Sequence, residues 1–376
     1  MYSETKRVEY LDSIRGLAAL FVLLSHTVGA FEWPPAYGTF VKWPFVSILF
    51  NGHEAVAMFF VLSGYVLSKP YVASPRTPPR RIFLPTFYLR RFTRIWVPWF
   101  VIFVASIFAQ NFLFSRSVTE PPVSRWLNQF WHLPLTTGDF FRQCAFALHD
   151  VTRQLLIQDW SLGAELKGSL LIPLFLFLSC GRRMLLLFVL AGLLLVFIGT
   201  GQCYVSFIIG VIIAKHGGFW AASFRPTGRF ARMAILCLGL LLYQGMSLTL
   251  ALYGEQPAAK LGWVCSSLGC AILLLSVFSS ESIQKLLNHK AIVFLGRVSY
   301  SVYLLQFIII LCLLPPLVRL ANGFGLVQRP ALFALTILAS TVATIGCAAV
   351  TYRFVEVPAI NLGHKLTKMI QRRFQK

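Results

Sequence analysis

Charged residues are scarce in this sequence, and acidic ones are the scarcest. Only 12% of the 376 residues are charged, with 13 aspartates and glutamates against 34 lysines and arginines. Hydrophobic residues make up 57% of the chain. Because a soluble domain carries far more charge than this, the composition indicates a protein that crosses the membrane several times.

Several signatures of common sites are also missing. No two of the eight cysteines have CxxC spacing, and most lie in apolar segments, so neither a zinc site nor a disulfide framework is expected. The absence of GxGxxG, Walker, GxSxG and HExxH motifs argues against a standard nucleotide fold, a serine hydrolase and a zinc protease. The first apolar segment has no cleavage site of small residues, so we expect it to be retained.

The formal net charge of +21 would by itself fit a nucleic-acid-binding protein. The lysines and arginines, however, lie mainly between the apolar stretches, which is the pattern of cytoplasmic loops in membrane proteins. The expected partner is therefore the lipid bilayer, and no nucleic acid is expected.

Ten apolar stretches are long enough, or nearly so, to cross a bilayer. If both termini are cytoplasmic, 25 lysines and arginines fall on the cytoplasmic side and eight on the other. We therefore predict an all-α fold, a polytopic bundle of about ten transmembrane helices in a single domain over 1–376, with no appended soluble domain. The sixth core is short and is expected to be tilted or re-entrant. The expected cores are 13–31, 53–70, 95–114, 163–180, 184–200, 203–215, 231–252, 261–279, 294–315 and 331–353.

The first apolar segment, Tyr10 to Phe31, contains two ionisable side chains. Arg15 lies near its start and His26 lies well inside, with ten residues between them. On a helix this spacing puts both side chains on nearly the same face, about 16 Å apart along the axis. Since an ionisable group inside a membrane is costly, His26 is a candidate functional residue. The plain alternative is a hydrogen-bonding group between helices.

A cluster of arginines follows the second expected span. Arg90, Arg91 and Arg94 lie within about one helical turn of one another. They either hold this segment in the cytoplasm or bind the phosphates of a nucleotide-like donor, because guanidinium groups pair bidentately with phosphate.

The segment DWSLGAELKGSLLIPLF, 159–175, combines polar residues with the start of an expected helix. Asp159 or Ser161 can cap that helix. Glu165 lies in its first turns, where the helix dipole favours a carboxylate. The functional alternative is that Glu165 orients or polarises His26, or binds an acceptor hydroxyl.

Two segments expected outside the cytoplasm, 32–52 and 115–160, are rich in aromatic residues. Interfacial anchoring is the favoured interpretation, and a sugar-stacking surface is the alternative. The residues concerned include Trp33, Tyr37, Trp43, Trp126, Trp131, His132, His149 and Trp160.

A series of short motifs resembles the signatures of the membrane-bound acyltransferase-3 family. Two departures stand out: Glu54 lies farther from the phenylalanine pair than the acidic residue of many relatives, and Gln306 stands where relatives often have histidine. The motifs, in order, are LDSIRGLAAL followed by His26, FFVLSGY (59–65), FYLRRFTRIWVP (87–98), WSLGAE (160–165), FLGRVSYSVYLLQF (294–307) and RFVEVPA (353–359).

This resemblance implies an integral-membrane O-acyltransferase. It would move an acyl group, acetyl in our prediction, from cytosolic acyl-CoA as co-substrate to a hydroxyl of a carbohydrate or glycolipid, with no bound cofactor or metal. The implied location is a multi-pass position in the bacterial inner or plasma membrane. His26 and Glu165 would be catalytic, and Arg15, Arg90, Arg91 and Arg94 would bind the donor. The supporting residues would be Asp12, Glu54, Ser63, Gly64, Trp160, Ser161 and Tyr300.

Other functional classes fit the same residues. A proton-coupled transporter would also place His26, Glu54 and Glu165 in the membrane. A non-catalytic partner of polysaccharide export is a further alternative. A flippase for lipid-linked sugars is less favoured, because nothing resembles two inverted halves.

Overall fold

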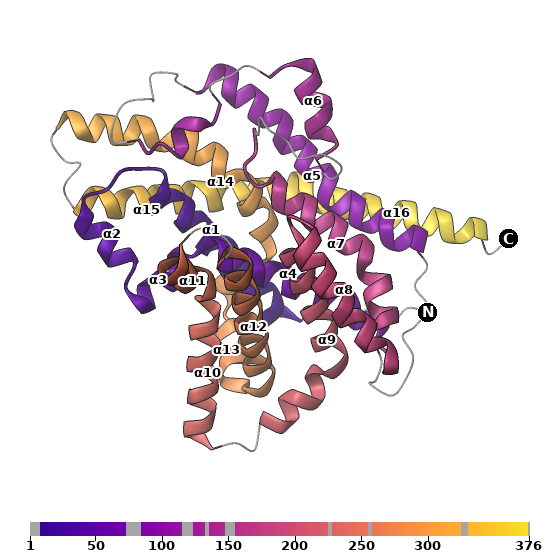
Figure 1. Cartoon of the computed structure of the whole chain (residues 1–376). Coiled ribbons are helices and arrows are strands. Elements are labelled where there is room, and N and C mark those ends of the chain that lie inside the picture. Colours follow the sequence, from indigo (N-terminus) through magenta and orange to yellow (C-terminus); the bar gives the residue numbers. More distant parts are fainter. Residues whose placement is uncertain are drawn as a thin grey trace. The chain divides into compact units, whose positions relative to one another are not determined.

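The chain is mainly helical in the part that the structure, a computed structural model, describes. The described residues are 8–72, 84–114, 123–131, 135–146, 155–224, 228–254, 258–324 and 330–374. Within these ranges an isolated β-bridge joins Phe31 to Val123. The predicted all-α class is therefore confirmed (Figure 1). Outside the described residues lie His132, His149 and the basic residues Lys6, Arg7, Arg76, Arg80, Arg81, Arg116, Arg153, Arg225, Arg329 and Lys376.

The helices form two compact units. The first consists of Met1–Ala18, His53–Leu84 and Ala164–Gly296. It contains α4 (Gly52–Ser68), η1 (Lys69–Tyr71), η4 (Gly181–Arg183), α8 (Met184–Phe197), α9 (Gly201–Phe224), α10 (Arg229–Tyr243), α11 (Gly245–Tyr253), α12 (Ala258–Ser279) and α13 (Glu281–Leu287). It shares α1 (Glu9–Gly29), α7 (Asp159–Leu178) and α14 (Lys290–Gly323) with the second unit.

The second unit consists of Ala19–Gly52, Pro85–Gly163 and Arg297–Lys376. Besides its parts of the shared helices, it contains α2 (Pro35–Val41), α3 (Pro44–Phe50), α5 (Leu84–Phe112), η3 (Leu127–Gln129), α6 (Thr137–Cys144), α15 (Pro330–Thr351), the π-helical η5 (Tyr352–Glu356) and α16 (Val357–Phe374).

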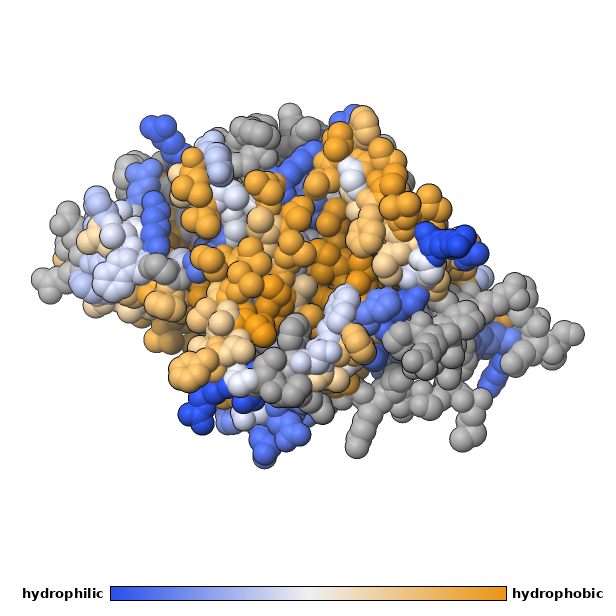
Figure 2. Space-filling model, turned by 60° about the horizontal axis from the view of Figure 1, so that its bottom comes forward, coloured by the Kyte–Doolittle hydropathy of each residue, from blue (hydrophilic) through white to orange (hydrophobic). Residues whose placement is uncertain are grey.

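Seven helices in the described ranges are long and apolar enough to cross a membrane, and α10 with α11 would make an eighth. Each of the ten expected cores overlaps a helix, but α4, with 17 residues, and α8, with 14, are shorter than a usual span. Hydrophobic side chains cover much of the face shown in Figure 2, as a lipid-facing surface requires. A multi-pass membrane protein is therefore supported, whereas the count of ten and the cytoplasmic termini stay predictions.

Two expected spans differ from the prediction. The sixth, expected to be short, is the 24-residue α9, whose helix continues past Lys215. The seventh, expected to be continuous over 231–252, breaks at Gln244, where α10 and α11 meet at a bend of 56°.

Side chains from other helices stabilise the break between α10 and α11. Glu54 in α4 accepts hydrogen bonds from the backbone N–H and the hydroxyl of Ser247, at 3.1 and 2.8 Å. The Ser266 hydroxyl in α12 accepts from the N–H of Met246 at 3.2 Å. The first N–H groups of a helix have no partner within it, and a membrane offers no water, so these side chains allow α11 to begin here.

Glycines set the close packing in the first unit. A Cβ atom at Gly64 in α4 would collide with the backbone of Phe207 in α9, and a Cβ at Gly210 in α9 would collide with the backbone of α4. Small residues allow helices to approach closely, and Gly64 and Gly210 do so between α4 and α9.

In the second unit the last helical stretch is longer than a bilayer requires. α15, η5 and α16 follow one another directly, and Pro330–Arg372 comprises 43 residues. At about 1.5 Å per residue this is roughly 65 Å, about twice the thickness of the hydrocarbon core. The expected core at 331–353 corresponds to α15 and the start of η5, and α16 extends beyond it.

Candidate functional site

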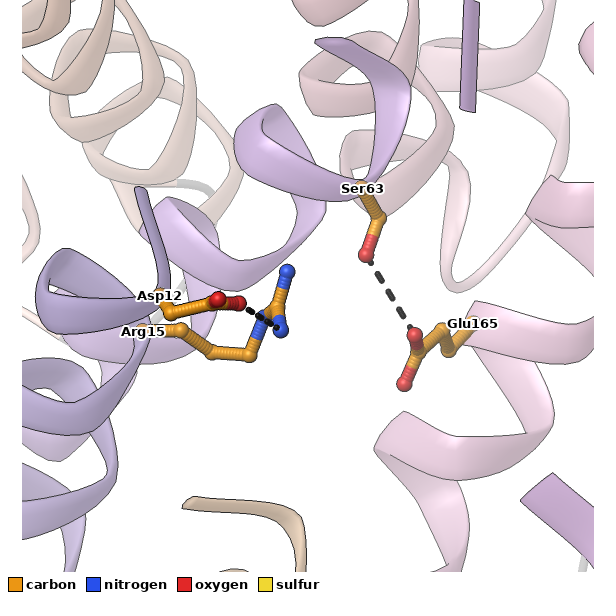
Figure 3. Close-up of polar contacts among 4 residues, drawn as sticks. All are labelled: Asp12, Arg15, Ser63 and Glu165. Carbon is orange, nitrogen blue, oxygen red and sulfur yellow. Dashed lines mark hydrogen bonds and ion pairs between the residues drawn. The ribbon is translucent and has the colours of Figure 1, made fainter. Parts of the chain in front are cut away.

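A polar cluster lies in the first unit, formed by Asp12, Arg15, Ser63 and Glu165; we call it the Glu165 cluster. Arg15 pairs with Asp12 one turn away on α1, with 3.1 Å between Nη1 and Oδ1. The Ser63 hydroxyl in α4 donates to Oε1 of Glu165 in α7 at 3.3 Å. Figure 3 shows the Arg15 guanidinium and the Glu165 carboxylate extending from α1 and α7 toward the same region, with Ser63 pointing into it from α4.

The local packing explains why Ser63 and Glu165 meet. Phe207 in α9 lies against Gly64 with its backbone and against Gly168 with its ring, where a Cβ atom would come within 2.5–2.9 Å of three ring carbons. Ser63 adjoins Gly64, and Glu165 lies one turn before Gly168. Phe207 therefore fixes α4 and α7 at the separation that this hydrogen bond needs.

The chemistry of the Glu165 cluster is that of a partly buried carboxylate with a fixed hydroxyl donor and a guanidinium on a facing helix. Arg15 and Asp12 expose 19% and 10% of their side chains. Asp12 offsets part of the Arg15 charge, and a guanidinium carries five N–H donors with which to bind anions. Ionisable groups held inside a helix bundle in this way mark binding or proton-transfer sites.

His26 belongs to the second unit and packs against an aromatic side chain of the 115–160 segment. Its imidazole stacks on the Trp126 indole, with 5.5 Å between ring centroids and 28° between planes. Trp126 in turn contacts Phe307 in α14 edge-on at 6.3 Å. The next residue, Thr27, donates from its hydroxyl to Ser340 in α15 at 3.0 Å. These contacts fix the imidazole plane, and the indole face is well suited to stabilise an imidazolium.

This packing changes the interpretation of the aromatic segments. Trp126 was expected to be an interfacial anchor or part of a sugar surface, yet it contacts the candidate base directly. Trp131 is 5% exposed and donates from Nε1 to the Leu155 carbonyl at 2.8 Å, so it is a core residue. Trp43, in contrast, is 58% exposed, as an anchor would be.

The start of α7 lies in a buried polar network of the second unit rather than in simple caps. The Asp159 carboxylate accepts from Trp99 Nε1 at 2.7 Å and from Gln143 Nε2 at 2.8 Å. The Ser161 hydroxyl donates to the Gln158 carbonyl at 2.8 Å and lies 2.6 Å from the Tyr303 hydroxyl. The capping role expected for Asp159 or Ser161 is replaced by bonds to α5, α6 and α14.

Neither Trp99 nor Gln143 belongs to a helical cap or a charge pattern, so no sequence pattern marks them as polar partners. Gln158 was missed as well: it precedes the motif and donates to the carbonyls of Tyr303 and Leu304, both at 2.8 Å. The sequence signal available for Gln158 was a polar residue within an apolar stretch.

Among the supporting residues of the second unit, Tyr300 joins two helices. Tyr300 donates from its hydroxyl to the Ile95 carbonyl in α5 at 2.7 Å. Ser301 donates to the Glu356 carboxylate at 3.0 Å, which joins two family-like motifs at the end of the chain. Trp160 is 36% exposed.

The three arginines lie on a helix and not in a loop, because α5 begins at Leu84. Arg90 is exposed, Arg94 is half-buried and Arg91 is 8% exposed. Nε of Arg90 donates to the Thr367 hydroxyl in α16 at 3.3 Å. The structure thus places the three arginines of α5 and His26 in the second unit. The first unit contains Asp12, Arg15, Glu54, Ser63, Gly64 and Glu165.

Known proteins resemble this chain along most of its length. The model of a family described as an acyltransferase domain matches residues 8–353. The chain is 20% identical over 387 residues to the O-acetyltransferase OatA of Staphylococcus aureus strains NCTC 8325 and COL, an alignment that covers 94% of this chain and 57% of the relative. The O-acetyltransferase PaAT-1 of Phomopsis amygdali is 33% identical over 125 residues, which cover 31% of this chain and 25% of the relative.

The chain spans little more than half the length of the Staphylococcus relatives. No solved structure matches it. The family match, in contrast, contains α1, α4, α5 and α7, and with them His26, the arginines and every member of the Glu165 cluster. On that match, this chain belongs to the acyltransferase-3 family.

Proposed function

We propose that this chain is an integral-membrane O-acyltransferase that moves an acetyl group from acyl-CoA to a hydroxyl of a carbohydrate or glycolipid. The observation that carries the proposal is the hydrogen bond between Ser63 and Glu165, together with Arg15 on the facing helix. These residues come from three separate motifs of the family, and their side chains extend toward the same region of the first unit (Figure 3). The O-acetyltransferase relatives support transfer to oxygen.

The donor is bound in this proposal by the arginines of α5. Acyl-CoA carries several phosphate groups, and guanidinium groups bind phosphate oxygens in a bidentate geometry. Arg90 and Arg94 are accessible on the same face of the helix. Arg15, which pairs with Asp12, is the remaining proposed donor-binding residue.

His26 is the proposed general base. Its unperturbed pKa is near neutrality, so at cellular pH the neutral imidazole can accept the proton of the acceptor hydroxyl. The oxygen then attacks the thioester carbonyl, the carbon–sulfur bond breaks, and the CoA thiolate takes up the proton from the His26 imidazolium. The stacked Trp126 face stabilises the imidazolium formed on the way. In the alternative mechanism His26 itself carries the acetyl group.

Glu165 is the second proposed catalytic residue. Its carboxylate is oriented by Ser63 and lies in the first turns of α7. A fixed carboxylate of this kind binds a hydroxyl proton and favours the approach of an alcohol acceptor. We place the protein in the bacterial plasma membrane with its donor side in the cytosol, as the distribution of lysine and arginine supports.

Mass spectrometry tests this function directly. Surface glycans and small glycosides from cells with and without the gene should differ by acetyl groups, and purified protein with radiolabelled acetyl-CoA should transfer label to the extracted acceptor. Cells that express His26→Gln at normal levels are the matched control and should resemble the deletion. Identical acetylation in all three strains would refute the proposal.

A proton-coupled transporter is the second candidate, because broken helices with a nearby carboxylate form binding sites in transporters. The break between α10 and α11 beside Glu54 is the observation that favours it. Dependence on an acyl donor discriminates: purified protein that releases free CoA from acetyl-CoA only when acceptor is present is a transferase.

A further inference from the structure

The C-terminal helix α16 lies beyond residue 353, where the family match ends, yet it packs against the arginines of α5. One face of α16 is buried, including Gly363 and Thr367, whereas Lys365, Lys368 and Arg372 are exposed. The lysines and arginines of this tail contribute to the positive charge expected on the cytoplasmic side. Its contacts with α5 give it a second role.

The contact between α16 and α5 is close and specific. A Cβ atom at Gly363 would collide with the Thr93 hydroxyl, so glycine allows the two helices to approach here. One turn further along α16, Thr367 is fully buried and its hydroxyl accepts from Arg90 Nε at 3.3 Å. The same hydroxyl donates its proton to the Gly363 carbonyl at 2.7 Å. With its proton committed to that carbonyl, the oxygen presents lone pairs to Arg90.

This geometry restrains one nitrogen of Arg90 and leaves the rest of the guanidinium accessible. Nε is held by Thr367, while the side chain as a whole is exposed. The two terminal nitrogens of a guanidinium are the pair that can bind phosphate through two parallel hydrogen bonds. A long side chain that is already ordered loses less conformational entropy when it binds.

We propose that α16 completes the phosphate-binding face for the acyl-CoA donor, with Thr367 as the positioning residue that orients Arg90. The inference rests on the proposed function, because it assumes that Arg90 binds the donor. Thr367 touches neither the thioester nor the acceptor, so it acts on donor affinity and not on the chemical step.

Binding of acetyl-CoA to the full-length protein in detergent tests the role of Thr367. Thr367→Val keeps the shape and removes the hydroxyl, and we expect Kd and KM to rise about five- to tenfold with kcat unchanged. Thr367→Ser should restore wild-type affinity. Thr93→Val is the matched control, because Thr93 lies in the same interface but its hydroxyl donates to the Leu89 and Arg90 carbonyls of its own helix.

A double-mutant cycle separates a positioning role from a merely structural one. If Thr367 acts through Arg90, Thr367→Val should have no further effect in an Arg90→Gln background. Should Thr367→Val not fold, Gly363→Ala is the second variant: it should weaken binding by displacing α16, and Thr93→Ala should restore binding by removing the clash.

The outcomes distinguish the two proposals. Wild-type protein that binds no acetyl-CoA, or Arg90→Gln that binds it normally, would overturn both the donor assignment and this inference. If Arg90→Gln weakens binding but Thr367→Val behaves like Thr93→Val, or keeps its full effect in the Arg90→Gln background, only the role of α16 is overturned.

Discussion

Ser63 in α4 and Glu165 in α7, 102 residues apart in the chain, form a hydrogen bond of 3.3 Å between hydroxyl and carboxylate. A carboxylate in a helix bundle needs donors because the surrounding medium supplies little water. This bond therefore orients the Glu165 carboxylate, and it gives the serine of the FFVLSGY motif a role beyond helix packing.

The first prediction concerns this pair. Ser63→Ala removes the donor and should lower kcat for acetyl transfer about three- to tenfold, because one hydrogen bond to a charged group is lost. Glu165→Gln keeps the shape and removes the charge, so it should lower kcat further without preventing membrane insertion. Both are measured as release of CoA from acetyl-CoA in the presence of acceptor.

Ser169→Ala is the matched control for Ser63→Ala. The Ser169 hydroxyl donates to the backbone carbonyl of Glu165 at 2.6 Å. Its loss should leave kcat nearly unchanged. Equal losses for Ser63→Ala and Ser169→Ala would show that packing, and not the carboxylate, is responsible.

The sequence predicted that Ser63 and Glu165 each matter, but not that they meet. Their contact depends on Phe207, whose position between Gly64 and Gly168 follows from tertiary packing and leaves no periodic signal. The bond from Arg90 to Thr367 was likewise invisible, because 277 residues separate the partners. In contrast, the approach of α4 to another helix was predictable, since Gly64 is a small residue within an apolar span.

The break after α10 shows a different limit. Apolar composition continues across Gln244 and Gly245, so hydropathy predicted one continuous span. Glu54 lies nearly 200 residues earlier, and only the fold brings it to Ser247. A local pattern cannot reveal a helix terminus that is stabilised by a side chain from elsewhere.

The second prediction follows from that contact. Glu54→Ala leaves the N–H of Ser247 without its partner and should cost about 1–3 kcal/mol, seen as a lower apparent Tm in detergent. Glu54→Gln keeps an acceptor and should retain most of the stability and the transferase activity. A proton-coupling role predicts instead that Glu54→Gln keeps a normal Tm but loses function. The exposed neighbour His53, changed to alanine, is the control.

The third prediction concerns topology. The excess of lysine and arginine on one side, 25 against eight, predicts ten spans with both termini in the cytoplasm. Reporter fusions after Lys376 and within 115–150 should therefore report opposite sides of the membrane. Fusions that report the same side would mean that the number of spans between them is wrong.

The fourth prediction tests the arginines of α5. Charge reversal at Arg90 or Arg91 should weaken acetyl-CoA binding at least about tenfold, since an acidic side chain repels phosphate. Arg90→Lys should also lose affinity, because an ammonium lacks the guanidinium fork. Arg142→Glu, an exposed change in α6, is the control and should bind normally. Equal affinity in all these variants would leave the cluster as a topology signal alone.

The last prediction concerns His26. If its imidazole is the general base, His26→Ala should lower the transfer rate about 10²–10⁴-fold with acetyl-CoA affinity nearly unchanged, because donor binding is assigned to the arginines. A larger loss, with label trapped on the wild-type histidine in a single turnover, would favour the acyl-histidine mechanism. Trp126→Leu removes the stacked ring and should have a smaller effect on kcat, since the imidazole loses its orientation but keeps its chemistry.

A purely interhelical role of His26 makes a different prediction: glutamine preserves a hydrogen bond, so His26→Gln would retain activity. Full activity in His26→Gln at normal expression would therefore exclude both the base and the acyl carrier, and the proton of the acceptor hydroxyl would need another destination.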